Sequence, residues 1–90
     1  MMAVDYFIRP KKGKDTKKLA DELYMRGIDV KSTLPSDGKR RDIDTREYSL
    51  HSRMKIKHHS DVYAVLNAIK AIEGVDDVKM FYDRITDFGT

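Results

Sequence analysis

Residues 48–56 of this 90-residue chain read YSLHSRMKI, and the rest of the architecture can be assigned outward from this stretch. Apolar side chains recur at every second position, with Ser52 as the one interruption. Successive side chains of a β-strand point to opposite faces of the sheet, so a period of two predicts a long strand that is buried on one face and exposed on the other. The set predicted to be buried is Tyr48, Leu50, Met54 and Ile56.

Three other segments carry strand patterns. Val4–Arg9 is rich in β-branched and aromatic residues and stops before Pro10, which favours a first strand. Ile28–Ser32 and Val78–Asp83 alternate apolar and polar residues, which predicts two more strands. The stretch 48–56 is therefore the third of four strands.

Two amphipathic helices are predicted between these strands. The first begins at Asp15 or Thr16, because either side chain can accept a hydrogen bond from a free amide of the first turn, and it ends at Gly27, where a left-handed cap is expected. The second is capped by Ser60 or Asp61 and ends at Gly74. The apolar faces of the two helices consist of Leu19, Ala20 and Leu23, and of Val62, Val65, Leu66, Ile69 and Ile72.

The order strand-helix-strand-strand-helix-strand predicts an α+β fold of the ferredoxin-like βαββαβ type. Right-handed crossovers place both helices on one face of a four-stranded antiparallel sheet, with the first and third strands in its centre. We expect one domain over residues 1–90. The core beneath the helices should hold Val4, Tyr6, Ile8, Ile28, Val30, Leu50, Met54, Ile56, Val78 and Met80.

Two segments fall outside this framework. Residues 35–47 are charged nearly throughout and contain the turn signal Asp37-Gly38, so we expect a long, mobile hairpin loop between the second and third strands. Residues 85–90 are predicted to form a tail.

The sheet face away from the two helices is the predicted interaction face. Alternation makes it basic and places two exposed phenylalanines on neighbouring strands. They could stack on the bases of a single-stranded nucleic acid, or a second sheet or a partner domain could cover them; we favour the second interpretation. The interaction face comprises Phe7, Arg9, Lys31, His51, Arg53, Lys55, Lys79 and Phe81.

Composition excludes several classes of function. The 18 basic and 15 acidic residues leave a formal charge of only +3, which is a weak indication of a nucleic-acid partner. The chain has no cysteine, so it has no disulfide, thiolate nucleophile or cysteine-ligated metal. No apolar run approaches the roughly 18 residues that cross a bilayer, so we expect no membrane insertion by this segment and a cytoplasmic location.

No catalytic constellation is recognisable. The chain lacks the G-x-S-x-G, P-loop and G-x-G-x-x-G motifs, and the adjacent His58 and His59 cannot face one metal from a strand. We therefore expect no enzyme activity, no cofactor and no metal. One candidate ligand loop precedes the first helix, whose N-terminus attracts anions. It comprises Lys12, Gly13, Lys14, Asp15 and Thr16.

Two segments resemble the ACT family of regulatory domains. Leu19–Val30, LADELYMRGIDV, is similar to that family's first helix, closing glycine and following strand. Val65–Val78, VLNAIKAIEGVDDV, is similar to the family's ending L-x-x-I-x-x-I-x-G-V-x-x-V. The resemblance implies a regulatory βαββαβ module that pairs through its sheets or helices. Gly13 is one residue out of register with the family's ligand-binding turn. The resemblance therefore does not imply that this chain binds an amino acid.

The chain is also similar to the cytosolic C-terminal domain of MgtC/SapB-type membrane proteins. That resemblance implies the soluble tail of a bacterial protein at the cytosolic side of the inner membrane. The expected function is a non-catalytic regulatory or interaction domain, which forms a homodimer or contacts a partner domain of the same parent protein. The alternative is single-stranded nucleic-acid binding through the basic interaction face.

Overall fold

The computed structural model describes residues 1–83, and the tail predicted at 85–90 lies outside the described residues. Within that part of the chain there are four strands and three helices. They are β1 (Met2–Pro10), α1 (Thr16–Met25), β2 (Lys31–Ser32), α2 (Pro35–Arg41), β3 (Leu50–Ile56), α3 (His59–Lys70) and β4 (Val75–Asp83).

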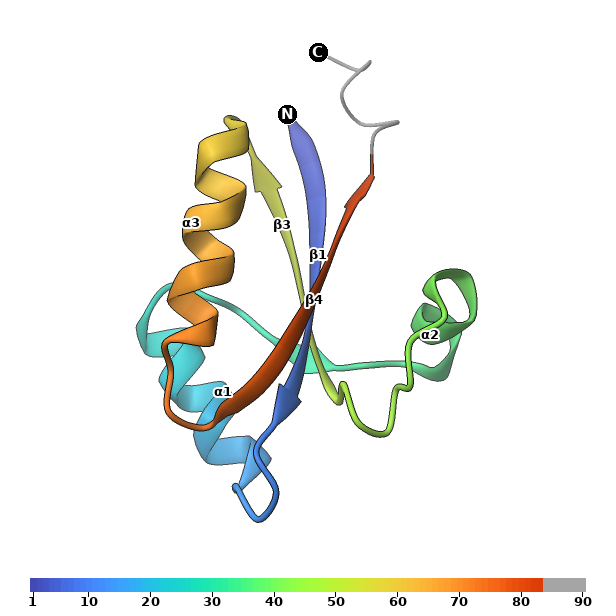
Figure 1. The fold of residues 1–90 in the computed structure, drawn as a ribbon, viewed down its shortest axis with the longest axis vertical. Helices are drawn as coiled ribbons and strands as arrows, with labels where there is room; N and C mark the ends of the chain where they lie inside the picture. The colour runs from blue at the N-terminus through green and yellow to red at the C-terminus, as the bar shows by residue number, and fades with distance from the viewer. Residues whose placement is uncertain (84–90) are drawn as a thin grey trace.

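The strands form one antiparallel sheet in the order β2-β3-β1-β4. This confirms the predicted α+β fold, with the first and third strands in the centre, and the architecture is compatible with a ferredoxin-like fold. Figure 1 views the sheet nearly edge-on, with α1 and α3 along one side and α2 on the other. Helices α1 and α3 correspond to the two predicted helices, whereas α2 was not predicted.

The helix-covered face of the sheet holds the main core, as the alternation predicted. Tyr6 is fully buried there, and its hydroxyl donates a hydrogen bond of 2.7 Å to the carbonyl oxygen of Val62 in α3. Of the ten residues predicted for this core, seven are buried, and Val30, Met54 and Met80 are partly buried against them.

The two predicted helix starts have different outcomes. At α1, the carboxylate of Asp15 accepts hydrogen bonds from the amides of Lys17 and Lys18, so the predicted cap is confirmed. At α3, the prediction of a Ser60 or Asp61 cap is wrong, because the cap position is His58, which makes no side-chain capping bond. Asp61 lies in the first turn instead, where its charge is favourable near the positive end of the helix dipole.

The second strand is shorter than predicted. Ile28 is buried in the core, but its amide bonds the carbonyl oxygen of Leu23, so its backbone closes α1 rather than joining the sheet. Gly27 adopts φ +82°, the left-handed conformation predicted for this cap. The ladder between β2 and β3 joins Lys31 to His51 and Ser32 to Leu50, and the amide of Thr33 adds a hydrogen bond to the carbonyl oxygen of Ser49 just beyond it.

Candidate functional site

The sheet face opposite α1 and α3 is covered by residues 35–48, which we call the cover. The prediction of a hairpin loop over residues 35–47 is wrong in part, because the cover begins with helix α2 (Figure 1). Pro35 is the first residue of this helix. The backbone N–H of Leu34 donates a hydrogen bond to Oδ2 of Asp37, with an N–O distance of 2.9 Å. The helix ends at Arg41 and is capped by Asp42, whose φ of 58° is left-handed. Seven residues are too few for a helical period to stand out in the sequence.

A second hydrophobic cluster fills the space beneath the cover. Phe7, Ile43 and Tyr48 are buried in it, and Phe81 packs against them. The predicted exposure of Phe7 is wrong, since its exposed fraction is 0%. Tyr48 is buried as predicted, but in this cluster and not in the core beneath α1 and α3, because β3 begins only at Leu50. The ring of Phe7 stacks on His51 at a centroid distance of 4.4 Å.

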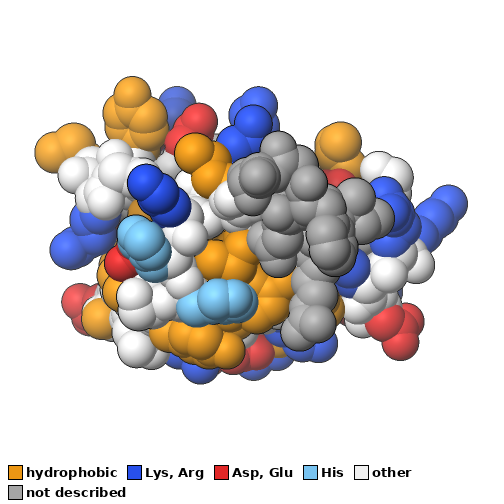
Figure 2. All heavy atoms as spheres, turned by 90° about the horizontal axis from the view of Figure 1, so that it is seen from above, with side chains coloured by type: hydrophobic (Ala, Val, Ile, Leu, Met, Phe, Trp, Pro, Cys, Tyr) orange, Lys and Arg blue, Asp and Glu red, His pale blue; other side chains and the backbone are white. Residues whose placement is uncertain are grey.

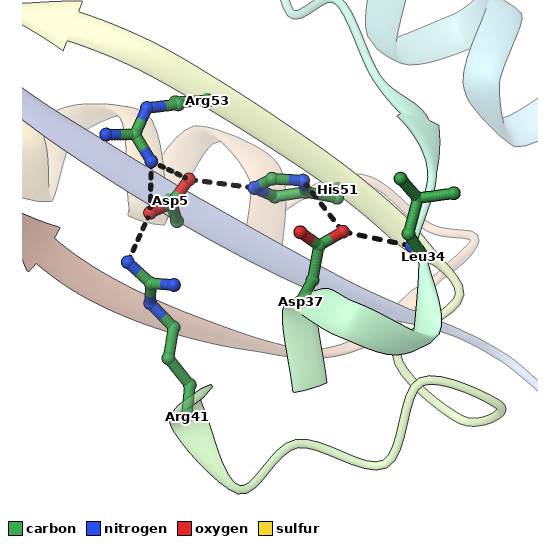
Figure 3. A network of polar contacts seen from close by, with 6 residues as sticks. All are labelled: Asp5, Leu34, Asp37, Arg41, His51 and Arg53. Carbon is green, nitrogen blue, oxygen red and sulfur yellow. Dashed lines mark hydrogen bonds and ion pairs between the residues drawn. The ribbon is translucent and has the colours of Figure 1, made fainter. Parts of the chain in front are cut away.

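Asp5 is the charged centre of this covered face. It lies in the middle of β1, on the same face as Phe7, and only 1% of it is exposed. Its Oδ1 is 2.8 Å from Nε2 of His51, and its Oδ2 is 3.0 Å from Nη2 of Arg41 and 3.2 Å from Nη1 of Arg53 (Figure 3). Three cationic or hydrogen-bonding groups from β3 and α2 therefore converge on one buried carboxylate.

The surroundings of Asp5 keep it ionised. Burial acts to raise its pKa, but the hydrogen bond from His51 and the charges of Arg53 and Arg41 outweigh that effect, so the pKa lies below its usual value. A buried carboxylate with such partners is a fixed anchor for the groups around it. Nδ1 of His51 lies 3.8 Å from the Asp37 carboxylate of α2.

Sequence reasoning missed Asp5, although the sequence contains a signal. Residues 2–8 read MAVDYFI, and Asp5 is the single charged residue in this apolar run. A charge in the middle of a central strand is expensive unless it is paired, so its presence there indicates a buried polar network.

Other members of the predicted interaction face lie around this network. His51, Arg53 and Lys31 border a cavity of about 310 Å³ together with Asp29. Lys55 is exposed on β3. On the other side of Phe7, Arg9 and Lys79 both approach the ring of Tyr48, at 5.3 and 5.0 Å from its centroid.

A basic cleft of about 520 Å³ lies where the loop after β1 meets the end of the cover. Five basic and two acidic side chains line it, so its charge is positive. Two of the charged groups are paired with each other: Nε of Arg9 lies 2.8 Å from the carboxylate of Asp76. The lining residues are Arg9, Pro10, Lys11, Lys12, Lys14, Thr16, Arg46, Glu47, Ser49 and Asp76.

The predicted ligand loop contributes to this cleft in part. Lys12, Lys14 and Thr16 line it, and Gly13 forms the turn between the two lysines with φ +82°. Asp15 instead occupies the N-terminal amides of α1 as the helix cap. The amides of Lys17 and Lys18 already donate hydrogen bonds to Asp15, so they would not be available to an anion in the cleft. Such an anion would be held by side chains of the loop instead.

The end of the molecule at which β1 begins carries apolar as well as charged side chains. Figure 2 looks onto this end and shows histidine side chains beside a hydrophobic area. The ring of His59 meets that of Tyr82 edge-on, with the centroids 5.8 Å apart.

Among residues 1–83, no group of three or more acidic, histidine or cysteine side chains could hold a metal ion. Nor is any helix of this described part both long and apolar enough to span a membrane.

Comparison of the sequence with models of known protein families, and with curated proteins, finds no match in either set.

Proposed function

We propose that this chain is a non-catalytic regulatory or interaction domain, of the ACT-like kind, that binds a small anion in the basic cleft. The observation that carries the proposal is the excess of positive charge around the cleft of about 520 Å³. A volume of this size is within the usual range for small-molecule sites. Its charge favours ligands that bear phosphate or carboxylate groups.

Two lysines of the cleft are available to such a ligand. Lys14 and Arg9 already have acidic partners, in Glu22 at 3.2 Å and Asp76 at 2.8 Å. Lys11 and Lys12 are exposed, and neither forms an ion pair with any residue of the described chain. Two unpaired ammonium groups on one loop are a suitable arrangement for a group that carries two negative charges.

The position of the cleft supports a regulatory role. One wall is the loop between β1 and α1, and the other includes Arg46 and Glu47, which directly precede Tyr48 of the cover. A bound anion would therefore tie the loop to the end of the cover. Ligand binding would be coupled to how firmly the cover lies on the sheet, which is the thermodynamic basis of regulation by a ligand.

Titration with pyrophosphate at low ionic strength, followed by calorimetry and by amide chemical shifts, tests the proposal. We expect the double variant Lys11→Gln/Lys12→Gln to bind at least about fivefold more weakly, and the affinity of the native chain to fall with added salt. Lys57→Gln is the control, since Lys57 is an exposed lysine that does not line the cleft. Undetectable binding by the native chain, or equal losses in all variants, would contradict the anion site.

The alternative of single-stranded nucleic-acid binding receives less support. It requires the ring of Phe7 to stack on a base, and that ring is buried under the cover.

A further inference from the structure

The outer edge of β4 is a long strand edge. Within residues 1–83, β4 pairs with β1 alone, over Val75–Asp83, and no other strand lies beside it. The opposite edge of the sheet is β2, which has only two residues. An unpaired strand edge presents a row of amide and carbonyl groups that can pair with another strand. Of the two edges, β4 is therefore the one that can bind a further strand over several residues.

The charges along β4 determine which strand fits it. Asp77 and Lys79 lie on the same face, because their partners in β1 are Arg9 and Phe7. Tyr48 of the cover approaches both residues: its hydroxyl donates to the Asp77 carboxylate, and its ring lies 5.0 Å from the Lys79 ammonium. The edge thus presents a negative and a positive side chain two positions apart, held on the face that the cover lies on.

We propose that this edge binds the β4 edge of a second copy of the chain, in an antiparallel arrangement centred on Val78. In a symmetric antiparallel pair, the central residue faces itself and the residues on either side face each other. Asp77 of each copy then lies opposite Lys79 of the other, so two opposite-charge pairs form. Opposite-charge pairs directly across strands are stabilising, and like-charge pairs are destabilising.

Neighbouring registers are less favourable. A pair centred on Asp77 would oppose two carboxylates, and one centred on Lys79 would oppose two ammonium groups. Centring on Phe81 would bring Lys79 opposite Asp83, but it would leave only residues 79–83 of β4 paired. The register centred on Val78 pairs the strand from Val75 to Phe81. Each pair in it joins residues of the same face, as an antiparallel ladder requires.

Paired in this way, the two sheets form one continuous sheet of eight strands. The proposal does not rest on the anion site, and the two tests use different residues. Failure of the anion titration would therefore leave this proposal standing, and the reverse is also true.

Charge exchange provides the experiment. Asp77→Lys places lysines opposite each other, and Lys79→Asp does the same with aspartates, so each variant alone should self-associate at least about tenfold more weakly than the native chain. An equimolar mixture of the two variants should form a heterodimer. In it the lysine introduced in one variant faces the aspartate introduced in the other, and the remaining native Lys79 and Asp77 face each other. Sedimentation velocity of each variant and of the mixture measures these outcomes. A mixture that associates no better than either variant overturns the proposal.

A second measurement uses the native chain, in case the variants do not fold. Circular dichroism and cooperative unfolding establish whether they do. In the native chain, backbone amides of β4 should become more protected from hydrogen exchange as the concentration rises from about 10 μM to about 1 mM. Exchange of β4 that does not depend on concentration, together with a monomer in sedimentation at about 1 mM, overturns the pairing.

Discussion

The side chains of Asp5 and His51 meet diagonally across the two central strands of the sheet. The register places Asp5 opposite Arg53 and Phe7 opposite His51, yet Nε2 of His51 reaches Oδ1 of Asp5 at 2.8 Å. The same carboxylate lies 3.0 Å from Arg41 of α2. One buried charge on β1 therefore joins the centre of the sheet to the cover (Figure 3).

Removal of the Asp5 carboxylate should destabilise the protein strongly. We expect Asp5→Ala to lower the free energy of unfolding by about 3 kcal/mol, because the side chain of Arg41 is only 20% exposed and would lose its partner. Urea denaturation measures the change. Asp21→Ala removes an exposed aspartate of α1 and should change the value by less than about 0.5 kcal/mol. Similar effects of the two substitutions would mean that Asp5 does not anchor the cover.

Stability should fall in acid because of the same carboxylate. The pKa of Asp5 is lower in the folded chain than in the unfolded chain, so the unfolded state binds more protons as the pH falls. The stabilisation is complete above the unfolded pKa of about 4 and is lost as the pH drops through the folded value. Urea denaturation between about pH 3 and pH 7 should show this loss, and it should be smaller in Asp5→Asn. An unchanged pH dependence in that variant would contradict the assignment.

Tyr6 and Tyr48 should ionise late in alkaline solution. Burial raises the pKa of Tyr6 to about 12, and burial together with the hydrogen bond to Asp77 raises that of Tyr48 to about 12. Because the folded values are raised, this stabilisation is complete below the ordinary tyrosine pKa of about 10 and is lost as the pH rises toward 12. An alkaline absorbance titration of Tyr48→Phe should show one late-ionising tyrosine fewer than that of the native chain. The control Tyr24→Phe, at a residue that is 68% exposed, should leave both late-ionising groups in place.

Gly38 should tolerate no side chain, because the cover folds back closely upon it. A Cβ atom at this position would lie 2.4 Å from the carbonyl oxygen of Ile43 and 2.6 Å from Cγ2 of Thr45. We expect Gly38→Ala to cost about 1–3 kcal/mol of unfolding free energy and to speed hydrogen exchange in the cover. Ser36→Ala, at an exposed position of the same helix, should have little effect. Equal exchange rates in both variants would show that the close contact does not hold the cover in place.

Local patterns were sufficient to predict the sheet and the helices on one of its faces. Alternation along β1 and β3 identified the side chains that pack under α1 and α3, and the cap at Asp15 located the start of α1. These features depend on neighbours in the sequence or on a simple period, so the chain encodes them locally. The basic loop of Lys12 and Lys14, which lines the cleft, is likewise evident from the sequence alone.

The pattern of residues was enough to establish the four strands, their order in the sheet and the face that the two long helices cover. Only the tertiary structure shows what lies on the other face, where the cover buries Phe7 and Asp5. A period of two tells which side chains share a face, but it does not tell which distant segment will shield them from water. That choice depends on contacts such as the one between Asp5 and Arg41, which are far apart in the chain and form only once the sheet has brought their surroundings together.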